Sequence, residues 1–276
     1  MRLDRALVAR GLARSRAHAA DLIDARAVAI DGVIATKAAQ AVPDGATITC
    51  DAPDVYVSRA AHKLTGALDA TGIVPAGRAA LDVGASTGGF TQVLLERGAA
   101  HVIAVDVGHG QLAPTLAADP RVTSIEGLNV RDLTSAHVEL DPATPSGIPR
   151  VDLVVADLSF ISLTLVVEPM VAAVGRADLL LMVKPQFEVG KSRLNKHGVV
   201  TSADDHAAAV ARVAQTMSDA GVTLHHVARS TLPGPTGNVE FFVWGSTAWH
   251  ASDARRPRLE PADLAGAIER ETGGRL

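Results

Sequence analysis

The segment Ala80-Leu81-Asp82-Val83-Gly84-Ala85-Ser86-Thr87-Gly88-Gly89-Phe90, followed by Val102-Ile103-Ala104-Val105-Asp106, is the most informative part of the chain. An apolar strand leads into a glycine-rich turn, a helix ends near Gly98, and a second apolar strand ends in an acid. Glycines let a ligand approach the backbone, and a carboxylate about 20 residues further on can bind both ribose hydroxyls of an adenosine. We therefore predict a βαβ unit that binds a nucleoside, which leaves NAD, FAD and S-adenosylmethionine open as cofactors.

Composition limits the class of protein. With 276 residues and 47% apolar content, the chain can bury the core of one large domain or of two. A net charge of -4 excludes a uniformly basic protein, so any contact with nucleic acid must come from a local basic patch. Cys50 is the only cysteine and the histidines are scattered, so we expect neither an internal disulfide nor a metal site.

The chain shows no export or membrane signal. Residues 1–5 lead into a charged amphipathic segment rather than an apolar one, and the longest apolar runs are too short to span a bilayer. We expect a cytoplasmic monomer without membrane contact.

The first residues form a pattern of their own. Apolar positions recur at helical spacing over two short segments, and Asp31-Gly32 is a strong hairpin signal after Val28 and Ile30. Residues 1–26 carry six arginines and three aspartates, a local excess of basic charge that suits RNA phosphates, although such arginines are as often merely solvated. We expect an RNA-binding domain with its linker over residues 1–57 and a second domain over residues 58–276.

A family resemblance supports RNA binding by the first domain. The pattern Arg2-Leu3-Asp4 with Leu7, then Ala13-Arg14-Ser15-Arg16, Leu22-Ile23 and Val28-Ala29-Ile30-Asp31-Gly32, resembles the small αL RNA-binding module of a ribosomal protein, pseudouridine synthases and some tRNA synthetases. The RNA contacts expected on this basis, together with one arginine after the linker, are Arg2, Arg5, Arg14, Arg16 and Arg59.

The second domain alternates strands and helices. We expect a helix over 58–71, further strands at 122–125, 151–156, 179–183, 222–228 and 239–244, and helices at 203–220 and 261–271. The apolar runs lack alternation, as parallel strands covered on both faces do, so the fold class is α/β with a doubly wound, Rossmann-like sheet.

Three chemically active side chains stand at predicted strand ends. Asp157 and Lys184 follow two strands, and Glu240 lies at the beginning of a strand that we expect to run antiparallel, which brings it to the same edge of the sheet. The apolar residues before Lys184 favour an uncharged amine able to accept a proton. Lys63, on the helix over 58–71, cannot be placed from spacing alone.

The order Lys63, Asp157, Lys184, Glu240 resembles the tetrad of FtsJ-like ribose 2'-O-methyltransferases, and longer motifs look like the TlyA family. These motifs are Ser58 to Leu64, Asp82 to Thr91, Val154 to Leu163, Val183 to Lys191 and Gly234 to Glu240. That family, often labelled haemolysin, joins an αL module to an enzyme that methylates cytidine 2'-hydroxyls in ribosomal RNA. The resemblance implies that activity on small- or large-subunit RNA, and with it an effect on capreomycin and viomycin susceptibility.

The resemblance also implies residue roles. The catalytic tetrad would be Lys63, Asp157, Lys184 and Glu240, with Lys184 aligning or accepting the hydroxyl proton and Asp157 orienting that lysine. The residues implied to hold S-adenosylmethionine are Asp82, Gly84, Ala85, Ser86, Thr87, Gly88, Gly89, Phe90, Asp106, Asn129, Val130 and Asp157. The glycine-rich turn has no lysine for a phosphate, which fits a donor without phosphates.

Two other functions compete with this one. A nicotinamide-dependent oxidoreductase accounts for the βαβ unit, but it explains neither the basic module nor the lysine after Val183. An RNA-binding or membrane-lytic protein with an inert α/β domain is the second alternative.

Overall fold

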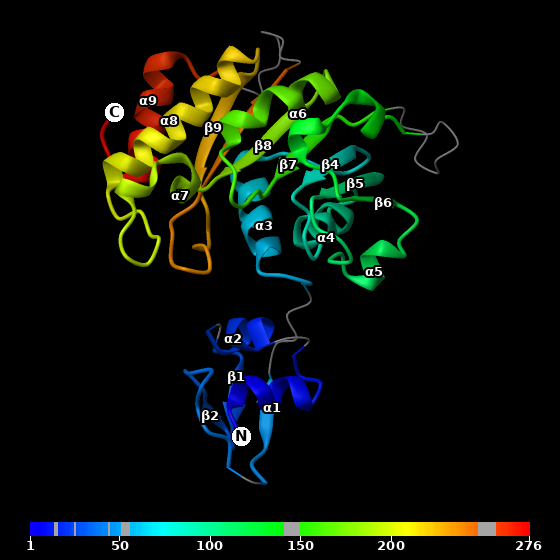
Figure 1. Cartoon of the computed structure of the whole chain (residues 1–276), viewed down its shortest axis with the longest axis vertical. Coiled ribbons are helices and arrows are strands. Elements are labelled where there is room, and N and C mark those ends of the chain that lie inside the picture. The colour runs from blue at the N-terminus through cyan, green and yellow to red at the C-terminus, as the bar shows by residue number, and fades with distance from the viewer. Residues whose placement is uncertain (14–15, 25, 44, 51–55, 141–149, 248–257) are drawn as a thin grey trace. The chain divides into compact units, whose positions relative to one another are not determined.

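The computed structural model describes residues 1–13, 16–24, 26–43, 45–50, 56–140, 150–247 and 258–276. The chain forms two compact units, Met1–Arg59 and Ala60–Leu276. Figure 1 identifies their helices and strands by label.

The amino-terminal unit packs two helices on a small sheet. Helices α1 (Leu3–Ala9) and α2 (Arg16–Asp24) precede strands β1 (Val28–Ile30), β2 (Val33–Ile34) and β3 (Ile48–Cys50), which pair antiparallel in the order β2-β1-β3. The hairpin predicted at Asp31-Gly32 is confirmed, because both residues have positive φ, +48° and +81°. Leu3, Leu7 and Ile23 are among the fully buried side chains that hold the unit together.

The second unit is built on one mixed sheet. Its strand order is β6-β5-β4-β7-β8-β10-β9, with all neighbours from β6 to β8 parallel and β10 antiparallel to both β8 and β9. The strands are β4 (Ala79–Val83), β5 (His101–Asp106), β6 (Val122–Glu126), β7 (Leu153–Ala156), β8 (Asp178–Val183), β9 (Thr223–Arg229) and β10 (Phe241–Ser246). Every residue of β4, β7 and β8 is buried, as expected for central strands with both faces covered.

Helices cover both faces of this sheet. The helices are α3 (Ala60–Thr71), α4 (Gly89–Glu96), α5 (Pro114–Ala117), α6 (Val167–Val174), α7 (Pro185–Glu188), α8 (Ala203–Asp219) and α9 (Pro261–Thr272). Short 3₁₀ turns lie at η1 (Val130–Asp132), η2 (Ser135–His137), η3 (Leu163–Leu165) and η4 (Lys191–Arg193). Figure 1 shows α6, α8 and α9 over one face and α3 with α4 at the other. The predicted α/β doubly wound class is therefore confirmed.

Some predicted boundaries were wrong. The strand expected at 151–156 begins at Leu153, and the one expected at 239–244 begins at Phe241, so Glu240 lies in the loop just before β10. The sequence analysis also missed α5, α6 and α7. The short α5 and α7 each begin at a proline that already has helical φ, and α6 contains Pro169 in its first turn, where the missing N–H costs little.

No helix among the described residues is long and apolar enough to cross a membrane.

Candidate active site

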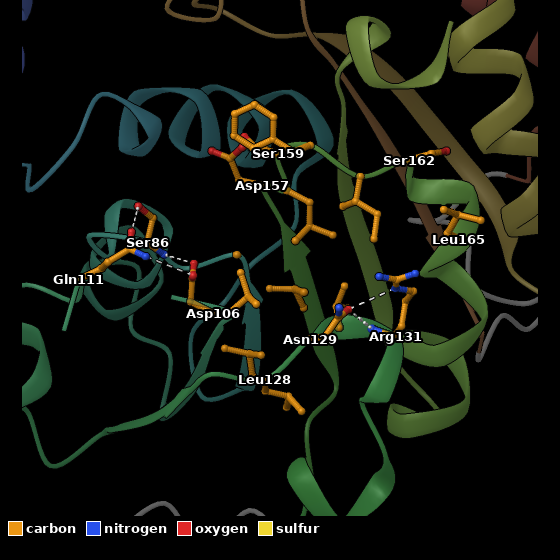
Figure 2. Close-up of a pocket in the computed structure, with 18 residues that line it drawn as sticks. Ser86, Asp106, Gln111, Leu128, Asn129, Arg131, Asp157, Ser159, Ser162 and Leu165 are labelled. Atoms are coloured by element: carbon orange, nitrogen blue, oxygen red, sulfur yellow. Dashed lines mark hydrogen bonds between the residues drawn. The ribbon is translucent and has the colours of Figure 1, made fainter. Parts of the chain in front are cut away.

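A pocket of about 720 Å³ opens where β4, β5 and β7 end. Parallel strands of an open α/β sheet place their carboxyl ends together, and ligands bind at that edge. Of the cofactor residues implied by the resemblance, six line the pocket: Gly84, Ser86, Asp106, Asn129, Val130 and Asp157. Figure 2 labels four of them, Ser86, Asp106, Asn129 and Asp157.

Asp106, the last residue of β5, is held by backbone donors. Its Oδ2 accepts a hydrogen bond from Ser86 N at 2.8 Å, and its Oδ1 accepts one from Gly108 N at 2.7 Å. These two contacts fix the carboxylate in one orientation at the mouth of the pocket. A carboxylate so placed can accept hydrogen bonds from both hydroxyls of a ribose.

Gln111 connects the two sides of this corner, and the sequence analysis missed it. Ser86 Oγ donates to Gln111 Oε1 at 3.2 Å, and Gln111 Nε2 donates to Asp106 Oδ1 at 3.5 Å (Figure 2). The sequence offered one sign of a close contact here, the glycines at positions 108 and 110. A Cβ on Gly108 would overlap the Gln111 side chain, so glycine is needed where Gln111 folds back. The Gln111 side chain therefore joins the glycine-rich turn to the carboxylate of Asp106.

The glycine-rich turn needs glycine for two different reasons. A Cβ on Gly84 would lie 2.8 Å from the carbonyl oxygen of Asp157, so glycine lets β4 and β7 close on the pocket. A Cβ on Gly88 would instead meet the side chains of Leu112 and Leu116, so this glycine serves helix packing.

Several implied cofactor residues do not line the pocket. Phe90 is 2% exposed and stacks on Phe242 with ring centroids 6.3 Å apart, so it belongs to the core. The others outside the lining are Asp82, Ala85, Thr87, Gly88 and Gly89. These residues belong to β4, the glycine-rich turn and the start of α4, and they do not face the pocket.

Asp82 is a fully buried acid beneath the pocket. Its Oδ2 accepts a hydrogen bond from Thr91 Oγ1 at 2.7 Å, whereas its Oδ1 has no partner among the described residues. Burial raises the pKa of the Asp82 carboxyl to about 7 against the opposing effect of the Thr91 hydrogen bond, and the charge of Asp157 adds to the rise.

Lys184 and Asp157 form an ion pair beside the pocket. Lys184 Nζ lies 2.6 Å from Asp157 Oδ1, and both side chains are largely buried. The contact lacks hydrogen-bond geometry at that oxygen, whereas Lys184 donates a hydrogen bond of 2.8 Å to Ser159 Oγ. Carboxylate and hydroxyl together hold the amine at the carboxyl ends of β7 and β8.

Lys63 and Glu240 form a second pair that is almost completely buried. Lys63 Nζ donates to Glu240 Oε2 at 2.5 Å, across 177 positions of sequence. Two glycines provide the space for this contact. A Cβ on Gly66 would lie 2.4 Å from Thr231, so glycine lets α3 approach the loop between β9 and β10 closely. A Cβ on Gly234 would lie 2.6 Å from Glu240 Oε1, so glycine also leaves room for the carboxylate.

The sheet register brings the two pairs together. Val183, the residue before Lys184, is opposite Phe241, the residue after Glu240, in the antiparallel pairing of β8 with β10. The antiparallel direction predicted for β10 is thus confirmed. Asp157, Lys184 and Glu240 lie at one edge as expected, and Lys63, which the sequence did not place, joins them through Glu240. No group of three or more histidine, cysteine, aspartate or glutamate residues in the described ranges is arranged to hold a metal ion.

Phe160 is an unexpected feature of the same edge. It follows Ser159 in the loop after β7, has a left-handed backbone with φ +66°, and is 92% exposed. Its ring packs against Phe187 with centroids 5.4 Å apart. A strained backbone that holds an aromatic ring in solvent beside a buried lysine points to a ligand-binding role for that ring.

The arginines predicted to contact RNA have different surroundings. Arg2 and Arg16 both bind the buried carboxylate of Asp4, at 3.0 Å and 2.8 Å, and these hydrogen bonds hold the pKa of Asp4 well below its usual range. The Arg5 side chain is exposed and has no hydrogen bond or ion pair with another described residue. Arg59 is partly exposed, and Arg14 lies outside the described residues.

The chain matches two family models. An S4 domain matches residues 1–48, where the αL module is predicted, and the FtsJ-like methyltransferase model matches residues 56–247. The 16S/23S rRNA (cytidine-2'-O)-methyltransferase TlyA of Mycobacterium tuberculosis is 53% identical over 88% of each chain. This chain belongs to the TlyA family of FtsJ-like methyltransferases.

Other relatives of this TlyA-family methyltransferase have a different name. Hemolysin A of Brachyspira hyodysenteriae is 34% identical over 88% of this chain and 98% of its own. A solved structure of a hemolysin-named protein from Streptococcus thermophilus superimposes with a TM-score of 0.71 at 29% identity, covering 99% of this chain and 96% of that one. The TlyA relative and the FtsJ-like methyltransferase model confirm the predicted family and enzyme class.

Proposed function

We propose that this enzyme transfers a methyl group from S-adenosylmethionine to the ribose 2'-hydroxyl of cytidine in ribosomal RNA. The observation that carries the proposal is the Lys184–Asp157 ion pair beside a pocket whose mouth holds Asp106. A buried amine next to a nucleoside-shaped pocket is suited to acting on a hydroxyl proton. The relative from M. tuberculosis is named for this reaction on 16S and 23S rRNA.

The pocket fits S-adenosylmethionine. Its volume of about 720 Å³ lies in the range of small-molecule sites. Asp106 would hold the ribose, the turn from Gly84 to Ser86 would face the methionine portion, and Asn129 with Val130 would lie along the adenine. Asp157 in the lining offers negative charge to a positive sulfonium, whereas a pyrophosphate would be repelled by it.

Bound there, the cofactor would supply an electrophilic methyl group. Lys184 would align the attacking 2'-hydroxyl and, in its uncharged form, accept the hydroxyl proton as the bond to the methyl group forms, while Asp157 and Ser159 fix the direction of the amine. Lys63 and Glu240 would complete the wall on the other side of the acceptor. Most of the acceleration would come from holding the oxygen in line with the methyl group.

The exposed ring of Phe160 supports a nucleotide as the acceptor. A base that stacks on this ring would place its ribose over the strand ends that carry Asp157 and Lys184. Stacking of a base on an aromatic side chain contributes about 1–3 kcal/mol. Phe160→Ala is therefore expected to raise the KM for RNA by about 5- to 150-fold with unchanged cofactor affinity, and Phe160→Trp to restore it.

The S4 domain would supply a second contact with RNA through exposed arginines such as Arg5. Since ribosomal RNA would be the substrate, we infer that the enzyme acts in the cytoplasm. Loss of the cytidine methylation would change susceptibility to capreomycin and viomycin. Drug susceptibility of strains with and without the gene tests this consequence.

The direct test uses radiolabelled S-adenosylmethionine and ribosomal subunits from cells that lack the gene. The wild-type enzyme should label cytidine 2'-oxygens, and Lys184→Ala should bind the cofactor near normally but transfer no methyl group. Near-normal transfer by Lys184→Ala would contradict the role of this lysine. Liposome leakage by pure protein in the absence of any methyl transfer would favour a lytic function, in line with the hemolysin names of some relatives.

A further inference from the structure

A basic loop lies next to the catalytic edge and has no role in the chemistry proposed above. It runs from α7 through η4 to α8 and exposes four basic or partly basic side chains: Lys191, Arg193, Lys196 and His197. Arg193 pairs with Asp205 at 3.1 Å. The amines of Lys191 and Lys196 have no hydrogen bond or ion pair with any residue that the structure describes.

The loop is anchored rather than loosely attached. Asn195 Oδ1 accepts hydrogen bonds from His197 N at 2.8 Å and Val199 N at 3.0 Å, which folds the loop on itself. Leu194 packs into a small apolar cluster with Val189, Val200 and Ala209. The positions of the two lysines are therefore set by the fold before any partner arrives.

A buried asparagine ties this loop to the catalytic wall. Asn238, which is 1% exposed, accepts a hydrogen bond from Val200 N and donates one to Gly198 O, both at 3.0 Å. It stands two residues before Glu240, the partner of Lys63. At its other end the loop begins seven residues after Lys184. Figure 1 shows this yellow-green loop beside the orange loop before β10.

We propose that the loop from Lys191 to His197 is a phosphate-binding surface that holds the RNA backbone beside the acceptor ribose. The inference rests on the proposed function and names the element of the methyltransferase unit that contacts the substrate backbone. Within a chain of net charge -4, two unpaired lysines on an anchored loop provide a local attraction for phosphates. Such contacts position RNA without reading its sequence.

The test is the double variant Lys191→Gln/Lys196→Gln, with 16S rRNA, 23S rRNA and assembled ribosomal subunits as probes across a series of NaCl concentrations. Each lost phosphate contact reduces the slope of log K against log[NaCl] by roughly 0.7–0.9, so the double variant should lose about 1.5 units of slope. The KM for ribosomal RNA should rise, while kcat, Tm and S-adenosylmethionine affinity stay near wild type. Lys191→Arg/Lys196→Arg should retain RNA affinity.

The matched control is Arg176→Gln, an exposed cation just before β8 and hence at the opposite end of the same strand from Lys184. It should leave RNA affinity and slope unchanged. The proposal is overturned if the lysine variant binds RNA with wild-type affinity and slope while the wild type methylates it. It is equally overturned if the variant loses affinity only for assembled subunits, which would assign the loop to a ribosomal protein. Absence of methyl transfer by the wild type would instead refute the proposed function.

Discussion

Two clusters of opposite charge in this molecule differ in almost every respect. In the amino-terminal unit, Asp4 binds Arg2 and Arg16, whose side chains are 47% and 56% exposed. In the methyltransferase unit, Lys63 and Glu240 are 7% and 1% exposed. The contacts of the first cluster join residues 2 and 12 positions apart, and the contact of the second joins residues 177 positions apart.

The difference shows what burial does to an ion pair. Both arginines hold the buried Asp4, but water screens their exposed sides and they keep donors available to a partner. The buried pair gives up its hydration and depends on mutual contact, so loss of either member leaves a charge without compensation. In the first cluster the loss of one arginine leaves the buried Asp4 a second cation, whereas in the second cluster the loss of either residue leaves the other without a counter-charge.

The largest expected effect comes from breaking the buried pair. Glu240→Gln leaves Lys63 buried without its carboxylate, which is expected to destabilise the enzyme by about 3–5 kcal/mol. Calorimetry should show a Tm lower by roughly 6–20 °C. The double variant Lys63→Met/Glu240→Leu should recover much of that loss but not methyl transfer. A double variant as unstable as Glu240→Gln would contradict the assignment of the cost to an uncompensated charge.

Asp82 sharpens the comparison, because it is buried and forms no ion pair with any residue in the described ranges. The unfolded carboxyl ionises near pH 4 and the folded one near 7, so its contribution to stability is present below pH 4 and is lost as pH rises to 7. At about 1.4 kcal/mol per pKa unit, the expected decline is a few kcal/mol. Tm measured from pH 5 to pH 8 should fall more steeply in the wild type than in Asp82→Asn. Parallel profiles would show that Asp82 does not titrate in this range.

Asp4 should behave in the opposite way. Its arginine partners lower its folded pKa, so its contribution is present above about pH 4 and is lost as pH falls through the lowered value. Asp4→Asn should lower the Tm of the amino-terminal unit modestly at pH 7, and this difference should shrink at acid pH and in 1 M NaCl. A loss unaffected by salt would mean that packing rather than charge explains it.

The smallest expected effect is a difference in Tm between variants of two amino-terminal arginines, Arg5 and Arg16. Arg5→Gln should weaken RNA binding and reduce the salt slope by about 1, with no change in Tm, because Arg5 has no partner in the described structure. Arg16→Gln should lower both RNA affinity and Tm, because it also removes a ligand of Asp4. Equal Tm for the two variants would remove the structural role of Arg16.

Local patterns in the sequence predicted much of this molecule. The glycine-rich turn, the acid at Asp106 and the apolar runs of β4 and β8 are local features, so the fold class and the position of the pocket could be predicted. Short helices such as α5 and α7 could not, since about one turn of helix gives no period to detect. Gln111 and Phe160 were missed because the glycines and the motif around them indicate a loop but do not show which side chain faces the pocket.

The sequence by itself determined which residues are chemically able to act: the strand-end residues Asp106, Asp157 and Lys184 and the basic amino-terminal helices. Only the tertiary structure decided which of them meet. Lys63 reaches Glu240 because β10 runs antiparallel to β8 and because Gly66 lets α3 approach the loop before β10. The physical reason is that strand and helix propensities act over a few residues, whereas contact between residues 177 positions apart depends on how the whole sheet packs.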